Sequence, residues 1–158
     1  MDTETLRIAI ATAFQGVTLG DGIGLWEAQA IDDYETDLVR AEQRCGDEKS
    51  DWQVLSRDCL RRCYSSLCFF DADGMRFHLP AFLLAEVDGE FDQLVFHLTE
   101  LDDYKREKLM SLNEKQKSAV AIFLEWCLGR DRYEYEHQSI TVALQEYWLH
   151  NSSDNTER

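Results

Sequence analysis

The sequence has little proline, no long apolar run and no CxxC motif, and each shortage excludes a class of protein. Pro80 is the only proline among 158 residues, and there are eight glycines, so few residues interrupt a helix. No apolar run approaches the roughly 20 residues that a membrane-spanning helix needs. The five cysteines form no CxxC pair, which is typical of reduced intracellular proteins rather than disulfide scaffolds.

The first residues also lack the pattern of a secretory signal. Such a signal begins with basic residues and continues with an uninterrupted apolar stretch. Here Asp2 and Glu4 come first, and Arg7 is the only basic residue before Phe14. We therefore expect a cytoplasmic protein.

The sequence offers little to hold a metal or a cofactor. Cys59 and Cys63 are one helical turn apart and could supply half of a zinc site, but no second Cys or His pair follows at zinc-site spacing. The glycine-rich segment 15–24 follows a predicted helix rather than a strand, which does not fit a phosphate-binding loop. We expect neither metal nor cofactor.

Negative charge is what the sequence has in excess. There are 31 acidic and 16 basic residues, for a net charge of −15. Such a charge repels nucleic acids and anionic membranes and attracts basic partners, although it also simply keeps a protein in solution. The candidate partner-binding residues are the acids of the two densest stretches: Asp32, Asp33, Glu35 and Asp37, and Glu86, Asp88, Glu90 and Asp92.

Apolar residues recur with helical spacing through most of the chain. Asn113 and Gln116 form a capping-box pattern, and Gly129 can end the helix that follows. Residues 1–150 are predicted to form a single helical domain, followed by a polar tail at 151–158. The predicted helices cover about 3–14, 25–43 in one or two pieces, 51–64, 79–87, 91–98, 113–128 and 139–150.

Residues 67–78 are predicted to be the exception, a short β-hairpin. The apolar run 67–70 precedes Asp71-Ala72-Asp73-Gly74, which has the composition of a tight turn. Pro80 then suits the first position of a helix. The predicted fold class is therefore mainly α, with six to eight helices and one short β-hairpin in a single domain.

The same hairpin holds the only candidate catalytic group. Alternation along its second strand would place Arg76 and His78 on one face, near Asp71 and Asp73, and such a set could perform acid–base chemistry. The alternative is a turn carboxylate paired with the arginine. Because no recognised nucleophile, metal or cofactor motif occurs, we do not predict an enzyme.

The segment Leu67–Leu83 resembles the core of an uncharacterised bacterial family, a domain of unknown function. The shared pattern is an apolar run followed by Asp-x-x-Gly-x-Arg-Phe-x-Leu-Pro-Ala, with Cys68 and His78 as departures from the usual residues. The resemblance extends from about Leu6 to Leu149 and includes Trp26-Glu27-Ala28, Asp33-Tyr34, Trp52 and Gln116–Leu124. It implies a small, mostly helical fold and no known activity.

Three hypotheses for function follow. The first is an acidic cytoplasmic protein that binds and neutralises a basic protein partner, with an immunity protein against a bacterial toxin as the leading example, because charge speeds the capture of a basic target. The second is an enzyme with an acid–base site at the hairpin. The third is an adaptor or chaperone-type interaction module.

Overall fold

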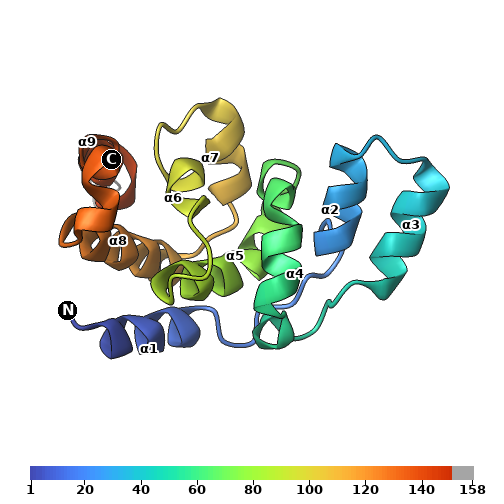
Figure 1. The fold of residues 1–158 in the computed structure, drawn as a ribbon, viewed down its shortest axis with the longest axis horizontal. Coiled ribbons are helices and arrows are strands. Elements are labelled where there is room, and N and C mark those ends of the chain that lie inside the picture. Colours follow the sequence, from blue (N-terminus) through green and yellow to red (C-terminus); the bar gives the residue numbers. More distant parts are fainter. Residues whose placement is uncertain (151–158) are drawn as a thin grey trace, which may run out of the picture.

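Helices account for all the regular structure in residues 1–150. The computed structural model describes residues 1–150, and within that range there is no strand. The elements, drawn in Figure 1, are nine α-helices, three short 3₁₀ helices and one π-helical turn: α1 (Thr3–Ala13), α2 (Leu25–Asp32), α3 (Asp37–Gly46), η1 (Trp52–Val54), α4 (Arg57–Arg62), η2 (Tyr64–Cys68), α5 (Ala72–Val87), α6 (Leu94–Leu98), α7 (Asp103–Leu109), α8 (Glu114–Leu128), η3 (Asp131–Glu136), α9 (His137–Ala143) and the π turn η4 (Leu144–Trp148).

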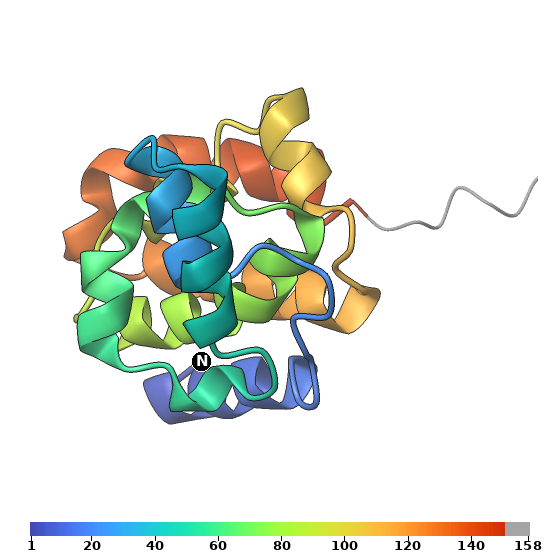
Figure 2. The ribbon, with the colours of Figure 1, turned by 90° about the vertical axis from the view of Figure 1, so that its right-hand side faces the viewer.

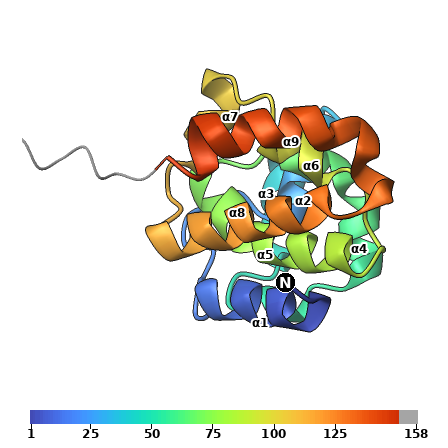
Figure 3. The same cartoon turned by 90° about the vertical axis from the view of Figure 1, so that its left-hand side faces the viewer.

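The long helix α5 lies at the centre of the molecule. It contacts α1, α4, α6, α7 and η1, and Figure 3 shows it between α1 and the layer formed by α8 and α9. Most of its residues are buried, among them Met75, Phe77, Phe82 and Leu83. One continuous apolar core therefore runs from α1 through α5 to α8 and α9.

The predicted β-hairpin at residues 67–78 is wrong. Residues 64–68 form η2, and the Asp71-Ala72-Asp73-Gly74 segment is the start of α5 rather than a turn between strands. Asp71 is the N-cap, and its Oδ1 accepts the Gly74 N–H at 2.8 Å. An aspartate that accepts a hydrogen bond from the N–H group three residues later can begin a helix, and the same residue types also form turns. The helix that follows is apolar on nearly every side, so it shows no helical periodicity.

Pro80 lies inside α5, not at the first position of a helix as predicted. A proline there cannot donate to the Arg76 carbonyl, which costs about 3 kcal/mol. The full burial of Phe77, Leu79 and Phe82 around it contributes roughly 1.5–3 kcal/mol for each side chain. Tertiary packing thus outweighs the local preference.

The glycine-rich segment 15–24 packs directly on the start of α5. A Cβ atom on Gly74 would lie 2.6 Å from the Ile23 carbonyl oxygen, and one on Gly22 would lie 2.7 Å from the Gly74 nitrogen. The Ile23 N–H also donates to Asp71 Oδ1 at 2.9 Å. These glycines permit two backbones to touch, which is a structural role.

The remaining expectations had mixed outcomes. The helix capped by Asn113 and Gln116 is confirmed as α8, with both hydrogen bonds of the capping box present. The sequence did not reveal α7, and the helix predicted over 51–64 is divided between η1 and α4. The nine α-helices of residues 1–150 also exceed the six to eight that were predicted. The predicted polar tail, residues 151–158, lies outside the described residues. Within residues 1–150 we find no helix with the length and apolarity that crossing a bilayer requires.

Candidate partner-binding site on the α2–α3 hairpin

Helices α2 and α3 form an antiparallel pair at one end of the molecule, called the α2–α3 hairpin (residues 25–46). Figure 1 shows α3 as the outermost helix, and Figure 2 shows it lying over α2. α3 packs against α2 and has no buried residue of its own. α3 therefore packs on one side only, and its outer face has no partner within the described chain.

The turn between the two helices presents Tyr34 to solvent. The N–H of Tyr34 donates to the Ile31 carbonyl at 3.1 Å and that of Glu35 to the Ala30 carbonyl at 3.0 Å, which is the Schellman pattern that ends a helix. Tyr34 occupies its left-handed position, with φ of 57°, where glycine is usual. The residue is 92% exposed. Neither backbone preference nor core packing accounts for a tyrosine there.

Apolar side chains continue from Tyr34 along the outer face of α3. Leu38 is 70% exposed, and Ala41 and Cys45 follow on the same stripe, three and seven residues further, both exposed. Large apolar groups exposed together, rather than singly, are typical of interaction surfaces.

The acids of the first predicted stretch are close to Tyr34 and Leu38 in the sequence. Asp33, Glu35 and Asp37 are exposed, and Asp32 is half-buried. Within residues 1–150 none of the four belongs to an ion pair. Arg40, the nearest arginine in sequence, donates to the Glu35 carbonyl oxygen instead. We call residues 32–38 the hairpin tip; none of its acids has an ion-pair partner in the described chain.

The base of the hairpin is held firmly by Asp47, which follows α3. The N-cap of α2 is Gly24, which has no side chain to accept from the first N–H groups of the helix. Asp47 supplies both acceptors, with Oδ1 bound to the Trp26 N–H at 2.8 Å and Oδ2 to the Glu27 N–H at 3.0 Å. Burial raises the pKa of Asp47, and these two N–H groups act in the opposite direction.

Arg44 connects the same base to the glycine-rich segment. Its guanidinium pairs with Glu27 at 3.1 Å, donates to the Gly20 carbonyl at 3.1 Å and also contacts the Gly22 carbonyl. Lys49 adds hydrogen bonds to the carbonyls of Arg44 and Asp47. The hairpin tip is thus an exposed surface on a well-supported base.

The second acidic stretch behaves differently, beginning with Glu86, which is completely buried. Its Oε1 accepts from the Tyr133 hydroxyl at 2.9 Å and from Arg132 at 3.0 Å, and its Oε2 accepts from the Leu94 N–H at 3.3 Å. Burial raises the pKa of Glu86 to about 7. Glu86 is therefore not available to a partner as the sequence predicted, because its side chain is buried. It joins α5 to α6 and η3 inside the protein.

Asp88 and Glu90 also have partners within the chain. Asp88 lies between Arg7 of α1, at 2.5 Å, and Arg57 of α4, at 3.1 Å, and Glu90 pairs with Arg61 of α4 at 3.3 Å. These pairs connect the end of α5 to two other helices. Only Asp92 of this stretch is exposed without an ion pair in the described residues, whereas three of the four acids of the hairpin tip are.

The four residues of the alternative catalytic group do not converge. Because they belong to a helix rather than a strand, Arg76 and His78 lie about 200° apart around its axis and not on one face. Arg76 pairs with Asp73 at 3.4 Å. His78 points into the core, stacked on Phe70 at 4.3 Å, with Nδ1 placed 2.6 Å from the Gly74 carbonyl oxygen, and burial lowers its pKa to about 4.

The described residues contain no group of three or more His, Cys, Asp or Glu side chains able to hold a metal ion. Cys59 is half-buried and Cys63 is buried, and burial raises the pKa of Cys63 to about 12. Its thiol is therefore protonated at neutral pH, and the structure places it as an apolar core residue.

Comparison with known families shows where the chain belongs. The family described as a family of unknown function, DUF6714, matches residues 2–152. The chain is a member of DUF6714. Searches of curated proteins and of solved structures found no match. Membership is consistent with the resemblance to an uncharacterised family, and it assigns no activity to any residue.

Proposed function

We propose that this DUF6714 protein binds a basic protein partner through the hairpin tip and neutralises it, as a bacterial immunity protein neutralises a toxin in the cytoplasm. The observation that carries the proposal is the composition of the tip. A tyrosine that is 92% exposed lies within three residues of Asp33, Glu35 and Asp37, which have no ion-pair partner in residues 1–150.

The two kinds of side chain would contribute differently to binding. Exposed ion pairs are worth only about 0–1 kcal/mol each, so the acids act mainly on the rate of association by attracting a basic surface. A tyrosine that enters a pocket is a frequent hot spot, worth about 2 kcal/mol or more. Tyr34, together with Leu38, would supply that contact. The acids would make binding selective for a basic partner.

The left-handed backbone of Tyr34 supports this assignment. A non-glycine residue there costs about 1–2 kcal/mol, and the exposed ring recovers none of it by packing within the chain. Contact with a partner would recover it. This account concerns binding, and it applies equally to an adaptor, which would hold the same partner without inhibiting it.

A photo-crosslinking comparison in cells that naturally produce the protein tests the proposal. A photoreactive phenylalanine analogue replaces Tyr34 in one variant and Tyr135 in the other. Tyr135 is a matched control because it is 90% exposed and lies in η3. We expect one discrete adduct from position 34, with a protein of basic isoelectric point, and none from position 135.

The captured protein is then purified, and its activity is measured with and without the wild-type chain. Inhibition at one-to-one stoichiometry supports neutralisation, whereas binding without inhibition favours an adaptor. Equal adducts from both positions, or an acidic protein at position 34, would contradict binding through the hairpin tip.

A further inference from the structure

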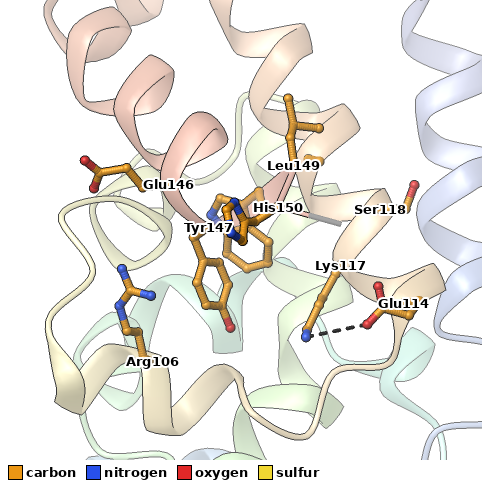
Figure 4. Close-up of a pocket in the computed structure, with 10 residues that line it drawn as sticks. Arg106, Glu114, Lys117, Ser118, Glu146, Tyr147, Leu149 and His150 are labelled. Atoms are coloured by element: carbon orange, nitrogen blue, oxygen red, sulfur yellow. Dashed lines mark ion pairs between the residues drawn. The ribbon is translucent and has the colours of Figure 1, made fainter. Parts of the chain in front are cut away.

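A second surface, far from the hairpin tip along the chain, has the form of a small-molecule site. A cavity of about 450 Å³ lies between α7, the first turns of α8 and the end of η4. Pockets for small ligands commonly have volumes of 300–1,000 Å³. Figure 4 shows its lining, with Tyr147 at the centre and with Arg106 and Lys117 on either side of it.

A π-helical turn builds one wall of this cavity. Residues 144–148 are wound more widely than an α-helix, and the Leu149 N–H donates to the Leu144 carbonyl at 2.9 Å, five residues earlier. Such turns are rare and often occur at functional sites. Here the turn brings Tyr147 and Trp148 to the cavity from the same segment.

Arg106 has donors that the described chain does not use. Its Nε donates to the Leu101 carbonyl oxygen at 3.1 Å, and its guanidinium lies 5.1 Å from the centre of the Tyr147 ring. Its two terminal nitrogens make no hydrogen bond within residues 1–150. A guanidinium with a free planar edge is suited to a carboxylate, which it can hold with two parallel hydrogen bonds.

Two cations, Arg106 and Lys117, and two acids, Glu114 and Glu146, line the cavity, and the unused donors of Arg106 are what favour an anion. Lys117 pairs only loosely with the exposed Glu114, at 3.8 Å. Glu146 also lines the cavity, and Figure 4 shows its carboxylate turned away from Tyr147. His150 and Tyr147 are the other titratable groups of the lining. Burial raises the pKa of Tyr147, and the positive charge of Arg106 acts in the opposite direction. Arg106 and Lys117 thus lie on either side of the ring in a chain whose net charge is −15.

We propose that this cavity binds a small organic carboxylate with a flat apolar body. The carboxylate would be held by the free edge of the Arg106 guanidinium, and the body would lie against the Tyr147 ring. Lys117, on the other side of the ring, would add positive charge to the site. This site is independent of the hairpin tip and does not rest on the proposed function.

The test is a titration of the isotope-labelled full chain followed by NMR. Benzoate is the probe, and benzamide, which has the same shape without the charge, is the comparison. We expect benzoate to shift the amide signals of Ser118 and Tyr147 in a saturable way. The affinity for benzamide should be lower than that for benzoate by a factor of at least about ten.

Three variants assign the effect to the proposed residues. Arg106→Met and Lys117→Met should each weaken benzoate binding by about tenfold. Lys115→Met removes the same charge from an exposed position of α8 that does not line the cavity, and it should bind like the wild type. Unshifted signals elsewhere in each spectrum show that the variant is folded. The proposal is overturned if benzoate shifts nothing, if benzamide binds equally well, or if both lining variants match Lys115→Met.

Discussion

Replacing Asp47 by alanine should loosen the α2–α3 hairpin, because this one carboxylate serves as the missing cap of α2. The substitution removes acceptors from the N–H groups of Trp26 and Glu27, at 2.8 and 3.0 Å. Gly24 cannot replace them, and the carboxylate itself is buried. The loss should therefore exceed that of an exposed helix cap.

The magnitude follows from the two hydrogen bonds and from the cost of burying the charge. Hydrogen bonds to a charged group contribute about 1.5–3 kcal/mol each, and loss of a helix cap costs about 0.5–2 kcal/mol. Burial raises the pKa of Asp47, so part of the gain offsets desolvation of the carboxylate. We expect Asp47→Ala to lower the free energy of unfolding by about 2–3 kcal/mol.

Urea denaturation followed by circular dichroism measures this change. With a slope of about 2 kcal/mol per molar urea, the midpoint should fall by about 1 M. Glu42→Ala is the matched control, since it removes one exposed acid from the outer side of α3 and should stay within about 0.5 kcal/mol of the wild type. A midpoint for Asp47→Ala equal to that of the control would refute the capping role.

Two further substitutions test other parts of the structure. Gly74→Ala should destabilise the protein by about 1–3 kcal/mol, because the added Cβ would lie 2.6 Å from the Ile23 carbonyl oxygen. Gly46→Ala, whose Cβ would meet nothing within 4 Å, should be neutral or stabilising. Equal melting temperatures for the two variants would disprove the close contact. Glu86→Gln should remove a pH dependence of stability. The pKa of Glu86 is raised from 4.5 to about 7 in the folded state, so the native protein binds more protons between these values, and the stability that protonation provides is complete below pH 4.5 and lost as the pH rises through 7. The difference in unfolding free energy between wild type and variant should change by about 3 kcal/mol across that range, and parallel pH profiles would show that the carboxyl group does not titrate there.

Local signals in the sequence predicted those helices whose ends and periodicity lie in their own residues. Asn113 and Gln116 define the start of α8 because their hydrogen bonds are made within one turn. Asp71 was ambiguous, since the same residue types begin a helix and form a turn. The burial of α5 on nearly all sides settles it, and that burial depends on α1, α7 and the glycine-rich segment. α7 carries few apolar residues, so its sequence shows no clear stripe.

The candidate site needed tertiary structure for a related reason. Both acidic stretches look alike in the sequence, but Asp88 pairs with Arg7, 81 residues away, and Glu86 with Arg132, 46 residues away. No local pattern reveals such partners. The sequence placed acids at residues 32–37, while the left-handed Tyr34 and the unpartnered face of α3 became visible only in the fold.

Association kinetics test the central claim, binding of a basic partner through the hairpin tip, most directly. One variant changes Asp33, Glu35 and Asp37 to their amides, and the other changes Asp92, Glu125 and Glu134, which are exposed acids away from the tip. Each variant removes three of the 31 acidic residues, so their net charges are equal. Association is measured with the purified partner that cross-linking at position 34 identifies. The account predicts slower association and a flatter salt dependence for the tip variant, and near wild-type values for the other. Equal association rates for the two variants would contradict it and would leave the acidity of the tip without a role in binding.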